Sequence, residues 1–146
     1  MNGIPLFHLK DELNDRVNLA VIFDSGERFS SDAKGIFDLL NIAKTPHSLQ
    51  NAVAADKIVG RAAAFLYCRC NVKYLYAETL SEGGEKILKD NGISYSFGSL
   101  APAIMNRTGT GICPMDDAVK DTDDTDTDTA YTLIFQRAQE LRKNQG

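Results

Sequence analysis

The stretch Ala55–Leu66, ADKIVGRAAAFL, decides how the fold is predicted from this sequence. Its apolar residues recur three and four positions apart, which is the spacing of an α-helix. Because few polar residues interrupt them, we expect this helix to be buried on most sides. Gly60 and Ala64 leave one side thin, which would let a strand or a second helix approach closely. Asp56 and Lys57 would lie at its N-terminal end, beside the first free backbone N–H groups.

The other elements are predicted from the same periodicities and from turn signals. Short runs of apolar and β-branched residues predict strands, and apolar residues three or four apart predict helices. The dipeptide Ser25–Gly26 predicts a hairpin with a two-residue turn. The expected strands are residues 18–24, 27–30, 72–77 and 93–97, with an edge strand or extended loop at 100–105. Three of the expected helices are residues 5–16, 55–66 and 128–143. Another is capped by Ser31 or Asp32 and ends before Pro46. A fifth begins at the capping box Thr79–Glu82 and ends at Asn91.

This order of elements predicts one α/β domain over residues 1–146. We expect three α-β-α layers, with helices on both faces of a mixed sheet. The hairpin in that sheet is antiparallel, and the later strands, joined through helices, are parallel with right-handed crossovers. Residues 121–129, DTDDTDTDT, form an acidic loop before the C-terminal helix 128–143. We expect this loop to be solvated, and residues 121–126 to be dispensable for folding.

Composition and charge restrict the classes of partner and compartment. The chain has a formal net charge of −4 and no run of basic residues. We therefore expect neither nucleic acid nor a membrane to be a main partner, and the longest apolar run, residues 62–68, is too short to span a bilayer. The three cysteines are an odd number without a secretory signal, which indicates free thiols and a cytoplasmic protein. A homodimer is compatible with this composition.

Few residues have the spacing of a metal site or a nucleophile. Cys68 and Cys70 are separated by one residue, whereas the cysteine pairs of zinc sites have about two to four between them. The acidic run lacks the glycine and the bidentate glutamate of a calcium loop. We therefore expect no metal and no cofactor. Cys113 is the candidate nucleophile of an enzyme, with Asp116 or the distant His47 as its helper.

Residues 106–117, NRTGTGICPMDD, form a glycine-punctuated loop with the composition of a binding loop. Glycines let backbone N–H groups approach an anion, and the guanidinium fork of Arg107 suits a phosphate or a carboxylate. The glycine spacing matches neither a phosphate-binding loop nor a dinucleotide fingerprint. The alternative is a structural loop in which Arg107 pairs with Asp56 or Asp116.

Several of these stretches resemble a small uncharacterised prokaryotic family that is classed with the cytidine deaminase-like fold. The resemblance extends over residues 18–119, and its strongest blocks are DKIVGRAAA (56–64) and NRTGTGICPMDD (106–117). It implies a mixed five-stranded sheet with helices on both faces. Active deaminases open one helix with His/Cys-Ala-Glu and the next with Pro-Cys-x-x-Cys, which hold zinc. Here those helices open with Asp56–Lys57 and Ser81–Glu82, and Cys113–Pro114 reverses the expected dipeptide, so zinc-dependent deamination is not expected.

The resemblance implies a pocket at adjacent helix N-termini, surrounded by Asp56, Lys57, Ser81, Asn106, Arg107 and Cys113. Such a pocket suits a nucleotide-like or ribose-phosphate ligand. Asp56 would accept hydrogen bonds from ribose hydroxyls or serve as a modifiable carboxylate, and Lys57 and Arg107 would hold phosphate. Three hypotheses remain: a zinc-less deaminase-fold protein that binds this ligand, an enzyme of another class with Cys113 as nucleophile, and a structural or interaction protein with a vestigial site. Convergence of Asp56, Lys57 and Arg107 on one pocket would favour the first, and an exposed thiol beside a base the second.

Overall fold

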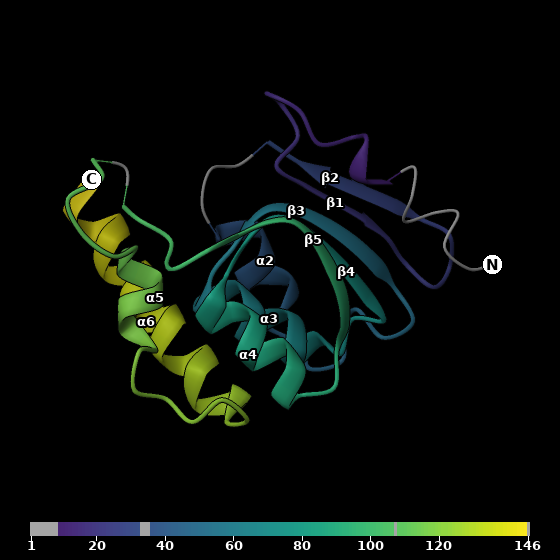
Figure 1. The fold of residues 1–146 in the computed structure, drawn as a ribbon. Helices are drawn as coiled ribbons and strands as arrows, with labels where there is room; N and C mark the ends of the chain where they lie inside the picture. Colours follow the sequence, from purple (N-terminus) through teal and green to yellow (C-terminus); the bar gives the residue numbers. More distant parts are fainter. Residues whose placement is uncertain (1–8, 33–35, 107, 146) are drawn as a thin grey trace.

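The centre of the molecule is a mixed five-stranded sheet with the strand order β2-β1-β3-β4-β5 (Figure 1). The computed structural model describes residues 9–32, 36–106 and 108–145. Its strands are β1 Leu19–Ile22, β2 Arg28–Ser31, β3 Val53–Val59, β4 Tyr74–Ser81 and β5 Ser94–Ala101. β1 is antiparallel to both β2 and β3, whereas β3, β4 and β5 run parallel to one another. The mixed sheet, the antiparallel hairpin and the later parallel strands are therefore confirmed.

The helix predicted over residues 55–66 is wrong in its first half. Residues 53–59 form strand β3 in the middle of the sheet, and helix α3 (Arg61–Cys70) begins only after it. β3 is paired with β1 on one side and with β4 on the other, and both Ala54 and Ala55 are fully buried. A short apolar run is compatible with a buried strand or a buried helix, and periodicity alone does not separate them. The pairing on both edges is what makes this run a strand.

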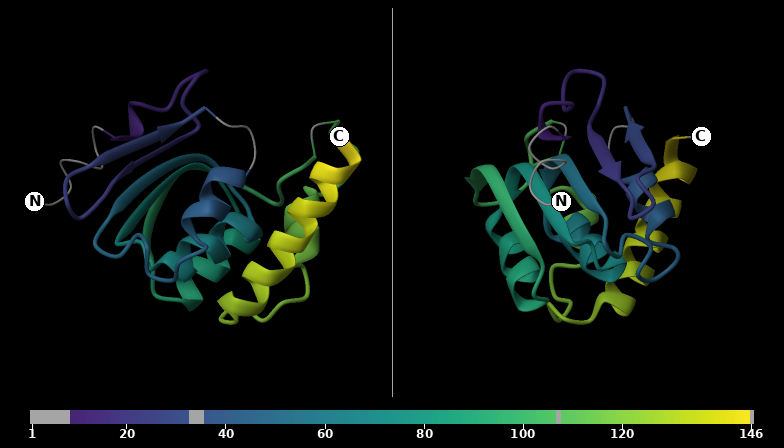
Figure 2. Two further views of the ribbon diagram at one scale, coloured as in Figure 1. Left: turned by 180° about the vertical axis from the view of Figure 1, so that it is seen from behind. Right: turned by 90° about the vertical axis from the view of Figure 1, so that its right-hand side faces the viewer.

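The named helices are α2 Phe37–Ile42, α3 Arg61–Cys70, α4 Glu82–Asp90, α5 Pro114–Ala118 and α6 Thr127–Gln145. Helices α2, α3 and α4 lie on one face of the sheet, and α5 and α6 pack on α3 at the side of this layer (Figures 1 and 2). Helix α3 is central, since it contacts each of the other four helices. Its side chains Phe65, Leu66 and Tyr67 are fully buried in one core that also includes residues of β1, β3, β4 and α6. The prediction of a C-terminal helix is confirmed, and the helix extends slightly beyond both predicted ends.

A layer of helices was predicted on the opposite face of the sheet as well. There the described part of the N-terminal segment contains only a short helical stretch, followed by turns. Leu9 forms a small buried cluster there with Ala20 of β1 and Ala55 of β3. Residues 9 and 10 are helical, but residues 11–17 form turns and bends, so the helix predicted to reach residue 16 ends earlier. The reason is local: the Asn14 side chain accepts hydrogen bonds from the N–H groups of residues 16 and 17, which is a turn geometry. Residues 5–8 of the predicted helix lie outside the described residues.

Two predicted helix caps and the hairpin turn also differ from the structure. Ser31 is the last residue of β2, and α2 begins later, after Ile36 and without a side-chain cap. Thr79 lies inside β4, and the cap of α4 is Ser81, whose Oγ accepts a hydrogen bond of 2.9 Å from the Gly84 N–H. Residues 23–27, rather than two residues, connect β1 to β2. Because β4 stays paired as far as Ser81, helix α4 cannot begin earlier, and its cap is Ser81 rather than the predicted Thr79.

The acidic segment 121–126 is mostly exposed, as predicted, but some of its carboxylates are engaged with the neighbouring helices. The Asp124 carboxylate lies 3.4 Å from the Arg61 guanidinium and 2.7 Å from the Lys86 ammonium group. These two cations belong to α3 and α4. Asp126 accepts a hydrogen bond from a backbone N–H in the first turn of α6 and therefore caps that helix. The segment thus connects three helices through its carboxylates.

Candidate functional site

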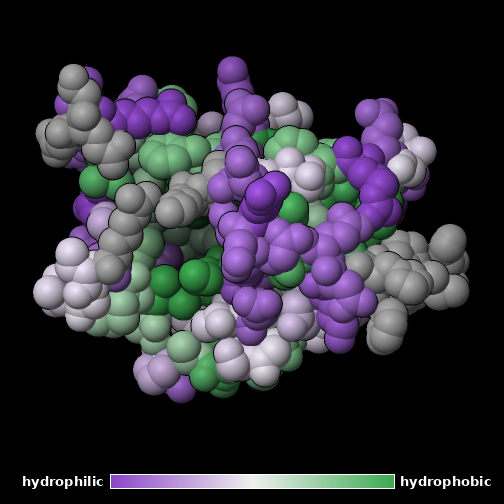
Figure 3. Space-filling view, turned by 90° about the horizontal axis from the view of Figure 1, so that it is seen from above, coloured by the Kyte–Doolittle hydropathy of each residue, from purple (hydrophilic) through white to green (hydrophobic). Residues whose placement is uncertain are grey.

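A cavity of about 610 Å³ opens where the carboxyl end of β3 meets α2, α3, α5, residues 104–106 and residue 108. In α/β sheets the carboxyl ends of parallel strands are where ligands usually bind. Apolar side chains form much of its wall. Among them are Phe37 of α2, Met115 of α5 and Met105, which precedes α5. Seen from above, the surface is hollowed to the left of its centre, and hydrophobic side chains are exposed within the hollow (Figure 3).

The cavity brings together four of the six residues that the sequence proposed for a site. Asp56 and Lys57 of β3, Asn106 and Cys113 all line it, although they come from segments far apart in the chain. Ser81 is not among the lining residues, because its buried hydroxyl caps α4. Arg107 lies outside the described residues, so the predicted convergence is met for Asp56 and Lys57 alone.

Asp56 is supported from the protein interior by Tyr67 of α3. The Tyr67 hydroxyl donates a hydrogen bond of 2.7 Å to Asp56 Oδ2, and Tyr67 is fully buried. Burial raises the pKa of Asp56 to about 6, although the hydrogen bond from Tyr67 acts in the opposite direction. Burial and the nearby carboxylate raise the pKa of Tyr67 well above its ordinary value. Tyr67 therefore remains a donor, whereas Asp56 changes its protonation state close to neutral pH.

The N-terminus of α3 is occupied by a carboxylate of the protein itself. The N-cap residue of this helix is Gly60, which has no side chain to accept a hydrogen bond. Asp116 of α5 replaces it: its Oδ1 accepts a hydrogen bond of 2.9 Å from the Ala62 N–H. Burial raises the pKa of Asp116, and this hydrogen bond and the nearby Arg61 act against that rise. The predicted anion site at this helix N-terminus is therefore already filled, just as Ser81 fills that of α4.

The contact between Gly60 and Asp116 is close enough to exclude any side chain at residue 60. A Cβ atom placed on Gly60 would lie 2.0 Å from Asp116 Oδ2. The next residue, Arg61, donates from Nη2 to the carbonyl oxygens of Val119 and Thr122, at 3.0 and 3.2 Å. The two sequence blocks 56–64 and 106–117 are thus joined through Gly60 and Asp116, and Arg61 extends the contact to residues 119–122.

The cysteines are not arranged as reactive or metal-binding groups. Burial raises the pKa of the Cys113 thiol, which disfavours the thiolate that a nucleophile needs. His47, one of its predicted helpers, is not among the lining residues of the cavity that the structure describes. Burial also raises the pKa of Cys68 to about 12 and that of Cys70 to about 11. In the described part of the chain, no group of three or more His, Cys, Asp or Glu residues is placed to hold a metal ion.

The described residues of the loop, 105–106 and 108–113, are held by hydrogen bonds within the loop. Asn106 Oδ1 accepts a hydrogen bond of 3.0 Å from the Thr110 N–H and another of 3.1 Å from the Thr108 hydroxyl. Met105 and Ile112 form an isolated antiparallel bridge across it. Asn106 thus stabilises this loop internally, and the predicted pairing of Arg107 with Asp56 or Asp116 lies outside the described residues.

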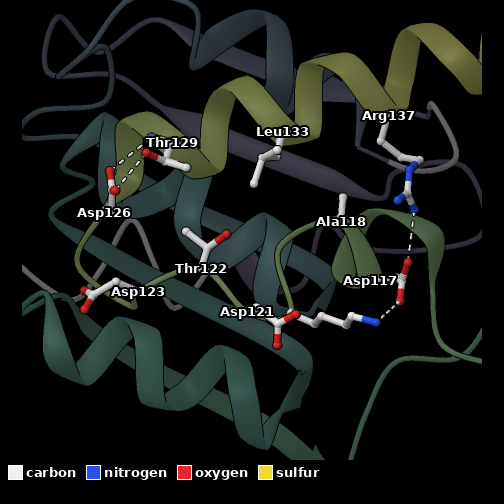
Figure 4. Close-up of a pocket in the computed structure, with 10 residues that line it drawn as sticks. Asp117, Ala118, Asp121, Thr122, Asp123, Asp126, Thr129, Leu133 and Arg137 are labelled. Carbon is white, nitrogen blue, oxygen red and sulfur yellow. Dashed lines mark hydrogen bonds and ion pairs between the residues drawn. The ribbon is translucent and has the colours of Figure 1, made fainter.

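A second hollow lies between α5, residues 119–126 and α6, with a volume of about 590 Å³ (Figure 4). Several of its side chains contact one another. Asp126 bonds to Thr129 at the start of α6, and Asp117 lies between Lys120 and Arg137. These contacts use Asp117, Lys120, Asp126 and Arg137 in the packing of α5 and α6.

Sequence reasoning missed two residues that determine the chemistry of the cavity. Tyr67 lies in the apolar pattern that predicts a buried helix. No local signal indicates that its hydroxyl contacts the carboxylate of Asp56, eleven residues earlier. Asp116 stood out only as a possible partner of Cys113 or Arg107. Its role as the cap of α3 follows from tertiary contact, although the absence of a capping side chain before Arg61 is a signal that some other residue must supply one.

Fold and site together define a class: an α/β domain with a mixed five-stranded sheet and a half-apolar, carboxylate-bearing cavity at the carboxyl end of its central strand. The chain belongs to the family described as "Domain of unknown function (DUF1893)", named TM1506, whose model matches residues 8–136. One similar solved structure is a DUF1893 family protein (TM1506) from Thermotoga maritima, with a TM-score of 0.75 and 23% identity. The match covers 92% of this chain and 86% of that one, and it supports the fold.

A search of curated proteins gave no significant match. Among the described residues, no helix combines the length and apolar character needed to cross a membrane.

Proposed function

We propose that this protein binds a small nucleotide-like ligand in the cavity at the carboxyl end of β3. The observation that carries the proposal is the convergence of Asp56, Lys57, Asn106 and Cys113 on one partly apolar cavity. Its volume of about 610 Å³ lies in the range of small-molecule sites, roughly 300–1,000 Å³. A few polar groups on an otherwise apolar wall are the usual composition of such sites.

The lining residues suggest how such a ligand would lie. Asp56 accepts hydrogen bonds from the ribose hydroxyls of the ligand. The aromatic ring of Phe37 and the thioether groups of Met105 and Met115 contact its base or another ring. The Ala62 N–H of α3 and the Gly84 N–H of α4 already have side-chain partners, so a phosphate would rely on Lys57. Arg107 is a second phosphate contact proposed from the sequence.

We extend the proposal to the fold type and the cellular setting. The strand–helix order around the site supports a cytidine deaminase-like fold, and the helices there begin with residue types that do not form the deaminase zinc set. The acidic net charge supports a small-molecule partner over nucleic acid or a membrane. The free cysteines support a cytoplasmic location.

The proposal is tested by calorimetry and thermal shift with adenosine, AMP and ADP-ribose. We expect at least one of them to bind, and Asp56→Asn and Lys57→Ala to weaken that binding. Matched controls are Asp24→Asn and Lys44→Ala, which change the same residue types at exposed positions outside the cavity. Failure of all three probes to bind would instead favour a structural or interaction protein with a vestigial site.

A further inference from the structure

We propose that Tyr67 is a positioning residue of this cavity: its hydroxyl holds one carboxyl oxygen of Asp56 and leaves the other oxygen for the ligand. The inference rests on the function proposed above and assigns a role to a side chain that does not itself line the cavity. It predicts that Tyr67 determines the pH range in which the site binds.

Asp56 lines the cavity from β3, whereas Tyr67 approaches it from α3 on the inner side and is fully buried. The distance of 2.7 Å from the Tyr67 hydroxyl to Asp56 Oδ2 is that of a strong O–H···O hydrogen bond. The other oxygen, Oδ1, accepts a long contact of 3.4 Å from the Ile58 N–H, and the Lys57 backbone also interacts with this carboxyl group. A carboxylate oxygen accepts more than one hydrogen bond, so Oδ1 keeps accepting capacity for a ligand.

A carboxylate in a poorly hydrated wall tends to take up a proton, and a protonated Asp56 would be a poorer acceptor for ligand hydroxyls. The hydrogen bond from Tyr67 stabilises the ionised form and opposes that tendency. Because Tyr67 does not ionise near neutral pH, it is available as a donor throughout the range in which Asp56 titrates.

Other titratable groups face the same cavity and must be distinguished from Asp56. The described ones are Asp38 of α2, Lys57 next to Asp56 on β3, Cys113 before α5, and Asp116 of α5. Asp38 accepts a hydrogen bond from Ser31, and Asp116 one from the α3 backbone. A site-specific measurement is therefore needed, rather than a bulk titration.

The test compares the wild type with Tyr67→Phe in the ligand-free protein, by carbon NMR of the Asp56 carboxyl group across pH. Loss of a hydrogen bond to a charged group should raise the Asp56 midpoint by about one pH unit. Tyr95→Phe is the matched control, since it removes a tyrosine hydroxyl bonded to Glu85 at 2.8 Å outside the cavity. An Asp56 midpoint that is the same in Tyr67→Phe and in the wild type overturns the inference, whether or not any probe binds.

The binding readout uses adenosine, because it carries no phosphate whose titration would overlap. In the wild type, affinity should fall as pH decreases through about 6, and in Tyr67→Phe this fall should occur about one unit higher. Reduced affinity with an unchanged pH profile would mean that Tyr67 has only a structural role.

If Tyr67→Phe does not fold, the NMR signal of Tyr67 Cζ in the wild type decides. This signal should titrate together with Asp56, and its failure to do so contradicts the contact. If adenosine does not bind, the proposed function is in question, and the ligand-free titration still decides the role of Tyr67.

Discussion

Gly60→Ala is expected to destabilise the fold because of the carboxylate that lies against it. The backbone at Gly60 has φ −99° and ψ −163°, an extended conformation that alanine adopts without strain. An alanine Cβ would nevertheless lie 2.0 Å from Asp116 Oδ2, so the carboxylate must move away from the start of α3. Overpacking costs about 1–3 kcal/mol, and loss of a helix cap costs about 1 kcal/mol more. We therefore expect a loss of about 2–4 kcal/mol in the free energy of unfolding.

The assay is urea unfolding of four proteins: the wild type, Gly60→Ala, Asp116→Ala and the double variant. Asp116→Ala alone should cost about 1–3 kcal/mol, because it leaves the buried Ala62 N–H without a partner. In the Asp116→Ala background the methyl group at residue 60 has room, so its additional cost should fall below about 1 kcal/mol. An equal cost of Gly60→Ala in both backgrounds would refute the reasoning. The larger Gly60→Leu should be severely destabilising in either background.

Three further predictions concern the cavity, the acidic segment and metal content. Asp56→Asn should stabilise the protein above pH 6, because burial raises the pKa of Asp56 from 3.8 to about 6 and folding therefore disfavours the ionised form. The gain should approach about 3 kcal/mol at pH 8 and vanish towards pH 4 in chemical unfolding, and a gain independent of pH would contradict this origin. Deleting residues 121–126 should lower the melting temperature by more than about 4 °C, since Asp124 bridges Arg61 and Lys86; a change within one degree would show that the segment is dispensable. Elemental analysis should find no stoichiometric zinc, and about one zinc per chain bound at the cysteines would overturn that expectation.

Much of the element order follows from local sequence signals. The hairpin, strand β4 and the C-terminal helix were all predictable, because alternating or helical apolar periodicity records which faces of a segment are buried. The position of a site near Asp56, Lys57 and residues 106–113 was predicted partly from a family resemblance. The cavity confirms that Asp56, Lys57, Asn106 and Cys113 lie together. Their use as a ligand site stays a prediction.

The sequence by itself determined where the chain buries apolar surface; only the tertiary structure decided which secondary structure and which polar partners result. Residues 53–59 are apolar in a way that suits either a helix or a strand, and pairing with β1 and β4 made them a strand. The cap of α3 comes from Asp116, more than fifty residues after Gly60, and Asp56 is supported by Tyr67 of the following helix. Local patterns report burial because burial acts on each side chain separately. A hydrogen bond or a close approach between distant residues depends on the geometry of two segments at once, which no local pattern contains.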